Sequence, residues 1–237
     1  QNYGNTETYN GVNWTEVNDL NTTKRGHSGF GTQTAALAFG GYTTDPGDNL
    51  TQTELWNGTN WTEVNDLNQK RHDGLSGGGT TSAGITAGGT STTAKTEVWN
   101  GTNWTEVNDL NTARRGAAGA GVSTSALVFG GSDPQKTETE KWNGTNWTEV
   151  NDLNTARDFA DASGITTAAL CFGGRASPGA TGNTELYNGT NWAEQNNMGT
   201  ARYTHGSAGS SVSALAMGGS HPPPASALNE EWNAGDT

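Results

Sequence analysis

Short apolar segments alternate with polar, glycine-containing segments along the whole chain, and they fall into groups of four. In one such group, residues 116–122 are almost all glycine and alanine, and residues 125–131 form a continuous apolar run that ends in two glycines. Residues 139–142 and 147–150 follow, joined by an Asn143-Gly144 turn. An uninterrupted apolar run predicts a strand covered on both faces, and Asn-Gly between β-rich segments predicts a tight hairpin. The group therefore predicts a four-stranded antiparallel sheet.

The same group recurs five times. The run Trp-Asn-Gly-Thr-Asn-Trp-Thr-Glu-Val-Asn-Asp-Leu-Asn occupies residues 56–68, 99–111 and 142–154 without change, and variants of it occupy 9–21 and 187–199. Its second aromatic residue falls every 43 to 47 residues, at Trp14, Trp61, Trp104, Trp147 and Trp192. A period of this length indicates one supersecondary unit copied around or along an axis.

Four-stranded sheets repeated radially form a β-propeller, in which each sheet is covered by its neighbours. We therefore expect an all-β fold and a single domain over residues 1–237: a five-bladed β-propeller with four antiparallel strands in each blade. The glycine- and alanine-rich first strands suit the crowded axis of such a ring.

The two ends of the chain are expected to meet in one blade. The third-strand signature occurs six times, because the chain both begins and ends with one. The closing blade would therefore combine residues 1–20 with residues 206–237. Glu7–Asn10 and Glu230–Asn233 both fit its third strand, and we expect the N-terminal one, because Asn10-Gly11 ties it to its hairpin partner.

Double glycines close the second strands, an aromatic residue ends the third, tryptophan begins the fourth, and a basic residue follows it. The double glycines are Gly40-Gly41, Gly88-Gly89, Gly130-Gly131, Gly173-Gly174 and Gly218-Gly219, and the basic residues are Lys24, Arg71, Arg114, Arg157 and Arg202. This combination resembles the kelch repeat, which implies a β-propeller. The aromatic residues lie closer together than is usual for kelch, and the Trp-Asn-Gly-Thr-Asn-Trp wording is more faintly similar to repeats of marine phage structural proteins.

One face of the ring is expected to carry the variable chemistry. The loops from strand two to three, and from strand four to the next strand one, open on the same face, and they differ in length and composition. The candidate binding residues on this face are Arg25, His27, His72, Asp73, Arg115, Asp158, Phe159, Tyr203 and His205. Binding residues gather on loops that a rigid scaffold positions, although such loops also vary simply because variation there costs little.

Composition excludes some partners. The net charge of −12 disfavours nucleic acid and anionic membrane surfaces, and no apolar run approaches the ~20 residues that span a bilayer. The lone Cys171 cannot form an intrachain disulfide. We expect no nucleic-acid or membrane partner.

We expect no enzyme activity and no cofactor or metal. His27, His205 and Tyr203 faintly resemble the copper ligands of galactose-oxidase-like propellers, but that chemistry also needs a cysteine beside its tyrosine, and Cys171 falls in a column of buried small residues. The segment 45–49 has oxygen ligands for Ca²⁺ without the spacing of a known loop, which favours a plain turn.

The function expected from the sequence is a non-enzymatic recognition module that binds a protein or a glycan on the variable face. Because the variable residues differ between blades, one composite site or a protein partner fits better than five identical sugar sites. The alternative is a purely structural propeller in a virion or cell-surface assembly. We expect a monomer, with self-association through a strand as the alternative, and an extracellular or virion-associated location.

Overall fold

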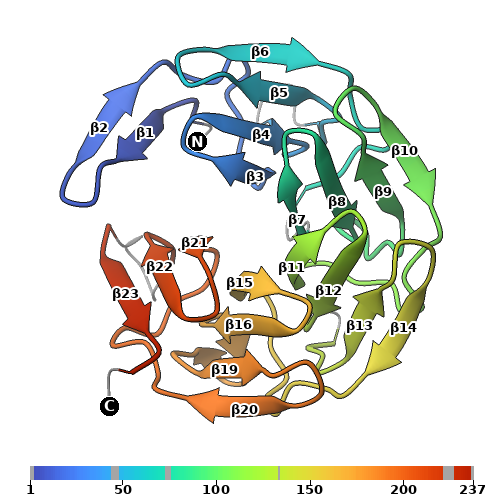
Figure 1. Ribbon diagram of the computed structural model, residues 1–237, viewed down its shortest axis with the longest axis vertical. Helices are drawn as coiled ribbons and strands as arrows, with labels where there is room; N and C mark the ends of the chain where they lie inside the picture. The colour runs from blue at the N-terminus through green and yellow to red at the C-terminus, as the bar shows by residue number, and fades with distance from the viewer. Residues whose placement is uncertain (1–2, 44–47, 73–75, 133, 221–226, 236–237) are drawn as a thin grey trace.

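The computed structural model describes residues 3–43, 48–72, 76–132, 134–220 and 227–235. It is an all-β protein whose antiparallel sheets are arranged around one axis as a five-bladed β-propeller, as predicted (Figure 1). Within the described residues, no helix has the length and apolar character needed to cross a membrane.

Four blades have four strands each. The first contains β3 (Ser28–Thr32), β4 (Ala35–Phe39), β5 (Thr53–Trp56) and β6 (Trp61–Val64). The second contains β7 (Ser76–Thr80), β8 (Ala83–Ala87), β9 (Thr96–Trp99) and β10 (Trp104–Val107). The third contains β11 (Ala118–Val122), β12 (Ser125–Phe129), β13 (Thr139–Trp142) and β14 (Trp147–Val150). The fourth contains β15 (Asp161–Ile165), β16 (Ala168–Phe172), β19 (Thr184–Tyr187) and β20 (Trp192–Gln195).

The fifth blade differs from the prediction. Within the described residues it contains three strands, β21 (Gly206–Gly209), β22 (Ser213–Met217) and β23 (Asn229–Asn233). The C-terminal copy of the third-strand signature pairs with β22, so our expectation that the N-terminal copy takes this place, and that the two termini share a blade, is wrong. The N-terminal copy, β1 (Thr6–Tyr9), pairs only with β2 (Trp14–Val17) in a separate hairpin beside the first blade. Figure 1 shows this hairpin and the fifth blade on opposite sides of an opening in the ring.

The hairpin between the third and fourth strands has the geometry that its sequence demands. In the first blade, Gly58 adopts a φ of +91°, which glycine tolerates best. The Asn57 side chain accepts hydrogen bonds from the backbone N–H groups of Thr59 and Asn60, both at 2.9 Å. The Asn-Gly-Thr-Asn sequence therefore specifies a turn in which the first asparagine side chain accepts hydrogen bonds from the turn's own backbone. The turn repeats because the hairpin repeats.

The small residues of the first strands are explained by crowding at the axis. A methyl group built on Gly78 of β7 would lie 2.2 Å from the carbonyl oxygen of Gly121 in β11. The innermost strands of consecutive blades pack against one another from β3 to β21 (Figure 1). The prediction that these strands need glycine, alanine and serine is confirmed here.

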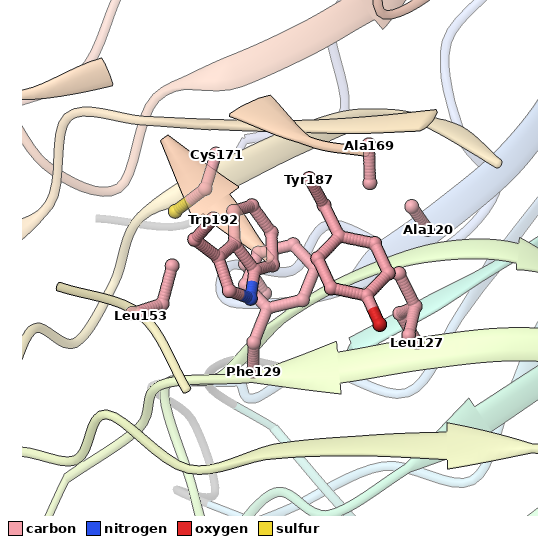
Figure 2. Packing of buried hydrophobic residues seen from close by; sticks show 9 residues of the cluster. Ala120, Leu127, Phe129, Leu153, Ala169, Cys171, Tyr187 and Trp192 are labelled. Carbon is pink, nitrogen blue, oxygen red and sulfur yellow. The ribbon is translucent and has the colours of Figure 1, made fainter. Parts of the chain in front are cut away.

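A tryptophan from each fourth strand holds consecutive blades together. Trp192 of β20 packs with Phe129, Leu153 and Cys171 in one buried cluster (Figure 2). Its indole N–H donates to the Thr139 hydroxyl of the preceding blade at 3.1 Å. The same bond joins Trp61 to Thr6, Trp104 to Thr53 and Trp147 to Thr96. A buried indole N–H needs such an acceptor, which explains the threonine that opens the third strand.

The basic residue after each fourth strand forms an ion pair with the glutamate of the next blade's third strand, and both side chains are buried in every pair except the last, where Glu230 is partly exposed. The pairs are Lys24–Glu54, Arg71–Glu97, Arg114–Glu140, Arg157–Glu185 and Arg202–Glu230. The guanidinium of Arg71 also donates to the carbonyl of Gly88, and the carbonyl of Arg71 accepts from the N–H of Gly41. Arg71 thus bonds to the double glycine of the second blade through its side chain and to that of the first blade through its backbone carbonyl.

Candidate functional site

The residues that directly follow the buried basic residues and the double glycines face each other in pairs. In each of four blades, the residue after the buried basic residue forms a backbone bridge with the residue after the double glycine. The bridged pairs are Arg25–Tyr42, Arg115–Ser132, Asp158–Arg175 and Tyr203–Ser220. In the second blade, the Thr90 hydroxyl takes the same place and accepts from the backbone N–H of His72 at 2.6 Å. We call the surface formed by these five pairs the variable face.

The variable face lies where the sequence placed it. Every pair joins the loop after a fourth strand to the loop after a second strand, as expected for loops that open on one side of an antiparallel blade. Because the backbone arrangement repeats while the side chains differ, the face presents different chemistry in each blade.

One cluster on this face spans the first two blades. The guanidinium carbon of Arg25 lies 5.1 Å from the ring centre of Tyr42. The Tyr42 ring in turn lies 5.5 Å from that of His72, whose Nδ1 is 2.7 Å from the Thr90 hydroxyl. Tyr42 therefore joins two predicted site residues, Arg25 and His72, from neighbouring blades.

A second cluster spans the fourth and fifth blades and is centred on Arg175. The guanidinium donates to both carboxylate oxygens of Asp158, at 3.0 and 2.7 Å. Its carbon lies 4.7 Å from the ring centre of Phe159 and 5.6 Å from that of Tyr203. Cation–π contacts of this kind favour a fixed guanidinium position. Arg175 thus joins three predicted site residues: Asp158, Phe159 and Tyr203.

Exposure separates the roles within this second cluster. The Asp158 side chain is 2% exposed, whereas the Arg175 side chain is 40% exposed. Gln135 also donates to Asp158, at 3.4 Å. Asp158 therefore acts as a buried anchor, and the arginine presents its remaining surface to solvent.

An axial cavity of about 620 Å³ runs between the innermost strands. Three predicted site residues line it: His27, Phe159 and His205. His205 is buried, and neither of its ring nitrogens has a hydrogen-bond partner within the described residues. Burial, together with the positive charge of Arg202, lowers the pKa of His205 to about 4. His205 is therefore neutral at neutral pH.

Asp161 also lines the axial cavity, and the sequence analysis did not single it out. Burial raises its pKa to about 6, while hydrogen bonds from the Ala162 backbone and from Ser207 act in the opposite direction. A carboxyl group with this pKa changes charge near neutral pH. The cavity therefore contains both a neutral histidine and a carboxyl group that takes up a proton readily.

The remaining predicted site residues have other surroundings. Arg115 lies on the variable face, where the Ser132 hydroxyl donates to its backbone carbonyl at 3.2 Å. Asp73 lies outside the described residues. Tyr42 and Arg175 were missed as individual site residues, although each begins a loop that the sequence marked as variable. The signal for both was their position directly after a double glycine.

The residues considered for metal chemistry lie in different surroundings. Cys171 is fully buried in the interface between the third and fourth blades, and burial raises the pKa of its thiol to about 12. The Tyr203 ring centre lies 5.6 Å from the guanidinium carbon of Arg175. Across the part of the chain that the structure describes, no three His, Cys, Asp or Glu side chains are grouped so as to hold a metal ion. Of the segment 45–49, only Asp48 and Asn49 are described, and Asp48 pairs with Lys70.

Comparison with known proteins adds no family to this description. No protein-family model matches the chain, and no curated protein matches it in sequence. The chain is thus characterised by what its own residues build: a five-bladed β-propeller with tryptophan-bearing strands and one chemically varied face.

Proposed function

We propose that this protein is a non-enzymatic recognition module that binds a protein or a glycan on its variable face. The observation that carries this proposal is the distribution of arginine. Four of the seven arginines are buried between blades: Arg71, Arg114, Arg157 and Arg202. The other three, Arg25, Arg115 and Arg175, all occupy paired positions of the variable face.

The side chains beside these arginines support the same proposal. Arg25 stacks on Tyr42, and Arg175 lies over Phe159 and near Tyr203. Arginine and aromatic residues contribute most of the energy at protein interfaces, and guanidinium groups bind carboxylates in a fixed geometry. In a chain of net charge −12, three arginines on one face favour a partner that presents carboxylate or other acceptor groups.

The chemistry differs from blade to blade, which favours one composite site. The cluster around Tyr42 contains Arg25 and His72, whereas the cluster around Arg175 contains a buried aspartate and two aromatic rings. Five equal sites would repeat the same side chains in every blade. The resemblance of the repeats to kelch propellers, and more faintly to marine phage structural proteins, supports an extracellular or virion-associated place for such a module.

The test is a glycan array combined with a pull-down from candidate protein extracts, using the whole chain. Arg25→Ala, His72→Ala, Arg115→Ala and Tyr203→Ala are expected to weaken binding of the captured partner. The matched control is Thr145→Ala, in an exposed turn on the opposite face. Binding that survives all four changes, or that Thr145→Ala weakens equally, contradicts the proposal.

A purely architectural role is the second candidate. It is favoured by the exact repetition of the Trp–Thr bond and the basic–Glu pair between blades, which makes a rigid body without requiring a ligand. Lack of binding to every glycan and protein tested would favour this role.

A further inference from the structure

The innermost part of the interface between the fourth and fifth blades is polar, although the same part of the preceding interface is apolar. Between the third and fourth blades, these positions are alanines packed in one cluster: Ala118, Ala120, Ala160 and Ala162. The strand registers give the equivalent positions between the fourth and fifth blades, which are Asp161, Ser163, His205 and Ser207. We call these four residues the polar quartet. The preceding interface shows that alanine is sufficient to pack two blades at this place.

The polar quartet lines the axial cavity of about 620 Å³. Ser207 extends from β21 toward the fourth blade, where its hydroxyl donates to the carbonyl of Ala162 at 2.9 Å and lies within hydrogen-bonding reach of the Asp161 carboxylate. Asp161 is the strand partner of Phe172, and cross-strand partners project on the same face of a sheet. The His205 and Phe172 ring centres lie 5.4 Å apart. The carboxylate and the imidazole therefore lie against the same face of the fourth blade.

Three members of the quartet have incomplete polar contacts among the described residues. Ser163 and His205 are only 6% and 7% exposed, and within that part of the chain neither the Ser163 hydroxyl nor either ring nitrogen of His205 forms a hydrogen bond. The Asp161 carboxylate forms no ion pair with any lysine, arginine or histidine that the structure describes. Buried polar groups without partners are rare and cost free energy, so several of them beside one cavity indicate a site for a bound molecule.

The hydrogen-bonding groups of the quartet favour a ligand that is rich in donors. A carboxylate only accepts hydrogen bonds, whereas a hydroxyl and a neutral imidazole both donate and accept. A protonated primary amine only donates, so it complements the Asp161 carboxylate in charge as well as in hydrogen bonding. Hydroxyl groups on the same ligand complement Ser163 and His205, because each can act as donor or acceptor.

The axial cavity also has the size of a small-molecule site. Its volume lies within the range of about 300–1,000 Å³ that is typical of such sites. Asp161 and Ser207 are only partly buried, so a molecule in the cavity can reach them. Ca²⁺ suits the site less well, because it takes about six to eight oxygen ligands and Asp161 is the only carboxylate among the described residues that line the cavity.

Phe159 supplies an aromatic ring beside the same cavity. Its φ is +50°, in the left-handed region where the equivalent residue of the third blade, Gly116, has a φ of +62°. A bulky residue is strained in this conformation, and such strain is typically retained at sites where a side chain has a function. An aromatic ring at this place suits the apolar face of a sugar-like ring.

We propose that the polar quartet binds a small primary amine that carries hydroxyl groups, as an unacetylated amino sugar does, inside the axial cavity. The ammonium pairs with the Asp161 carboxylate, the hydroxyl groups bond to Ser163 and His205, and Phe159 covers one side of the ligand. The ligand also links the fourth blade to the fifth, because the quartet comes from both. The site lies within the ring, so it does not require a partner on the variable face.

The test is calorimetric titration of the whole chain with glucosamine. N-acetylglucosamine and glucose are the matched probes, because they keep a hydroxylated ring but have no protonated amine. Wild-type protein is expected to bind glucosamine at least about tenfold more tightly than either, since hydrogen bonds between ionised groups are the stronger ones. Nα-acetyl-lysine amide, which has the ammonium without hydroxyl groups, should bind more weakly than glucosamine. The NMR signals of the Asp161 carboxyl carbon and the His205 ring should shift with glucosamine, which locates the ligand without any variant.

Variants test the same contacts. Asp161→Asn is expected to weaken glucosamine binding at least about tenfold, and Ser163→Ala, which introduces the residue of the preceding interface, should weaken it less. Glu149→Gln is the matched control, because it removes an exposed carboxylate on the outermost strand β14 and should bind glucosamine like the wild type. Arg25→Ala and Arg115→Ala should also bind glucosamine like the wild type, which separates this site from the variable face.

Five results would overturn the proposal. They are wild-type protein that does not bind glucosamine, equal binding of glucosamine and N-acetylglucosamine, equal binding of glucosamine and the lysine derivative, NMR shifts that spare Asp161 and His205, and Asp161→Asn protein that binds glucosamine like the wild type. The first result, combined with a shift of the Asp161 signal by Ca²⁺, would assign the cavity to a metal ion instead.

Discussion

The Arg114 guanidinium and the Glu140 carboxylate lie 2.5 Å apart, and neither side chain is exposed to solvent. The same guanidinium donates to the backbone carbonyls of Gly130 at 3.1 Å and Glu138 at 2.8 Å. The second carboxylate oxygen accepts from the side chain and backbone of Asn111. The pair and these hydrogen bonds thus join the second blade to the third.

Removing one partner of this pair should strongly destabilise the protein. Glu140→Ala leaves a buried guanidinium without its counter-charge, which typically costs about 3–5 kcal/mol of the free energy of unfolding. Glu149→Ala is the matched control, because Glu149 lies directly opposite Glu140 on β14 but is exposed. Its effect should stay within about 0.5 kcal/mol. Urea unfolding followed by tryptophan fluorescence measures both, and equal losses would contradict a special role for the buried pair.

The bond between Trp192 and Thr139 can be tested by removing only its acceptor. Thr139→Val keeps the shape of the side chain but leaves a buried indole N–H without a partner, which costs about 1–3 kcal/mol. Thr139→Ser keeps the hydroxyl and should lose less. Chemical denaturation of the two variants compares them, and a valine variant as stable as the serine variant would show that the bond contributes nothing.

Crowding at the axis predicts a large effect of one methyl group. Gly78→Ala would place its Cβ 2.2 Å from the Gly121 carbonyl oxygen, so the innermost strands would have to separate. We expect a loss of about 1–3 kcal/mol, the usual cost of overpacking. Gly179→Ala is the control, since a Cβ at Gly179 meets no atom within 4 Å. A melting temperature lowered by neither change would contradict the packing described for the axis.

The lowered pKa of His205 predicts that the free energy of unfolding falls in mild acid. Its pKa is lowered from 6.5 to about 4 in the folded protein, so folding favours the neutral ring. The contribution is fully present above pH 6.5 and is lost as the pH falls toward 4. His205→Phe keeps an aromatic ring against Phe172 and removes this titration, so relative to the wild type it should gain about 2 kcal/mol on going from pH 7.5 to pH 4.5. Parallel pH profiles of unfolding for the two proteins would contradict this.

The raised pKa of Asp161 predicts the opposite pH dependence, with a contribution to stability that improves as the pH falls. Its pKa is raised from 3.8 to about 6, so the charged form opposes folding above pH 6 and this cost disappears as the pH falls toward 3.8. Asp161→Asn should therefore be more stable than the wild type at pH 8 and equally stable near pH 4. Titration of the carboxyl carbon by NMR measures the pKa directly, and a value near 3.8 would contradict the effect of burial.

The strands were predictable because their signals are local. Asn143-Gly144 specifies a hairpin by its own backbone preferences, and the run from Ser125 to Phe129 specifies a buried strand by its continuous apolar character. The basic residue of each repeat was noticed in the sequence, but its partner was not. Arg114 and Glu140 are separated by the variable length of a loop, so no short pattern connects them.

The closing blade could not be predicted for a similar reason. Glu7–Asn10 and Glu230–Asn233 both have a glutamate and an aromatic residue in the spacing of a third strand, so either can pair with β22. Likewise, the sequence marked Asp158 and Tyr203 as site residues, but the guanidinium that joins them comes from a loop whose path the sequence does not specify.

The side chains of the bridged pairs on the variable face differ between blades, while the contacts that hold the blades together are made by other residues. Arg25 with Tyr42 and Asp158 with Arg175 occupy the same backbone frame, yet one pair stacks and the other carries opposite charges. Two positions in each blade can therefore be rewritten without touching the tryptophans or ion pairs that assemble the ring. Such a molecule could acquire a new specificity by exchanging whole blades, because each blade contributes its own pair of side chains to the combined surface.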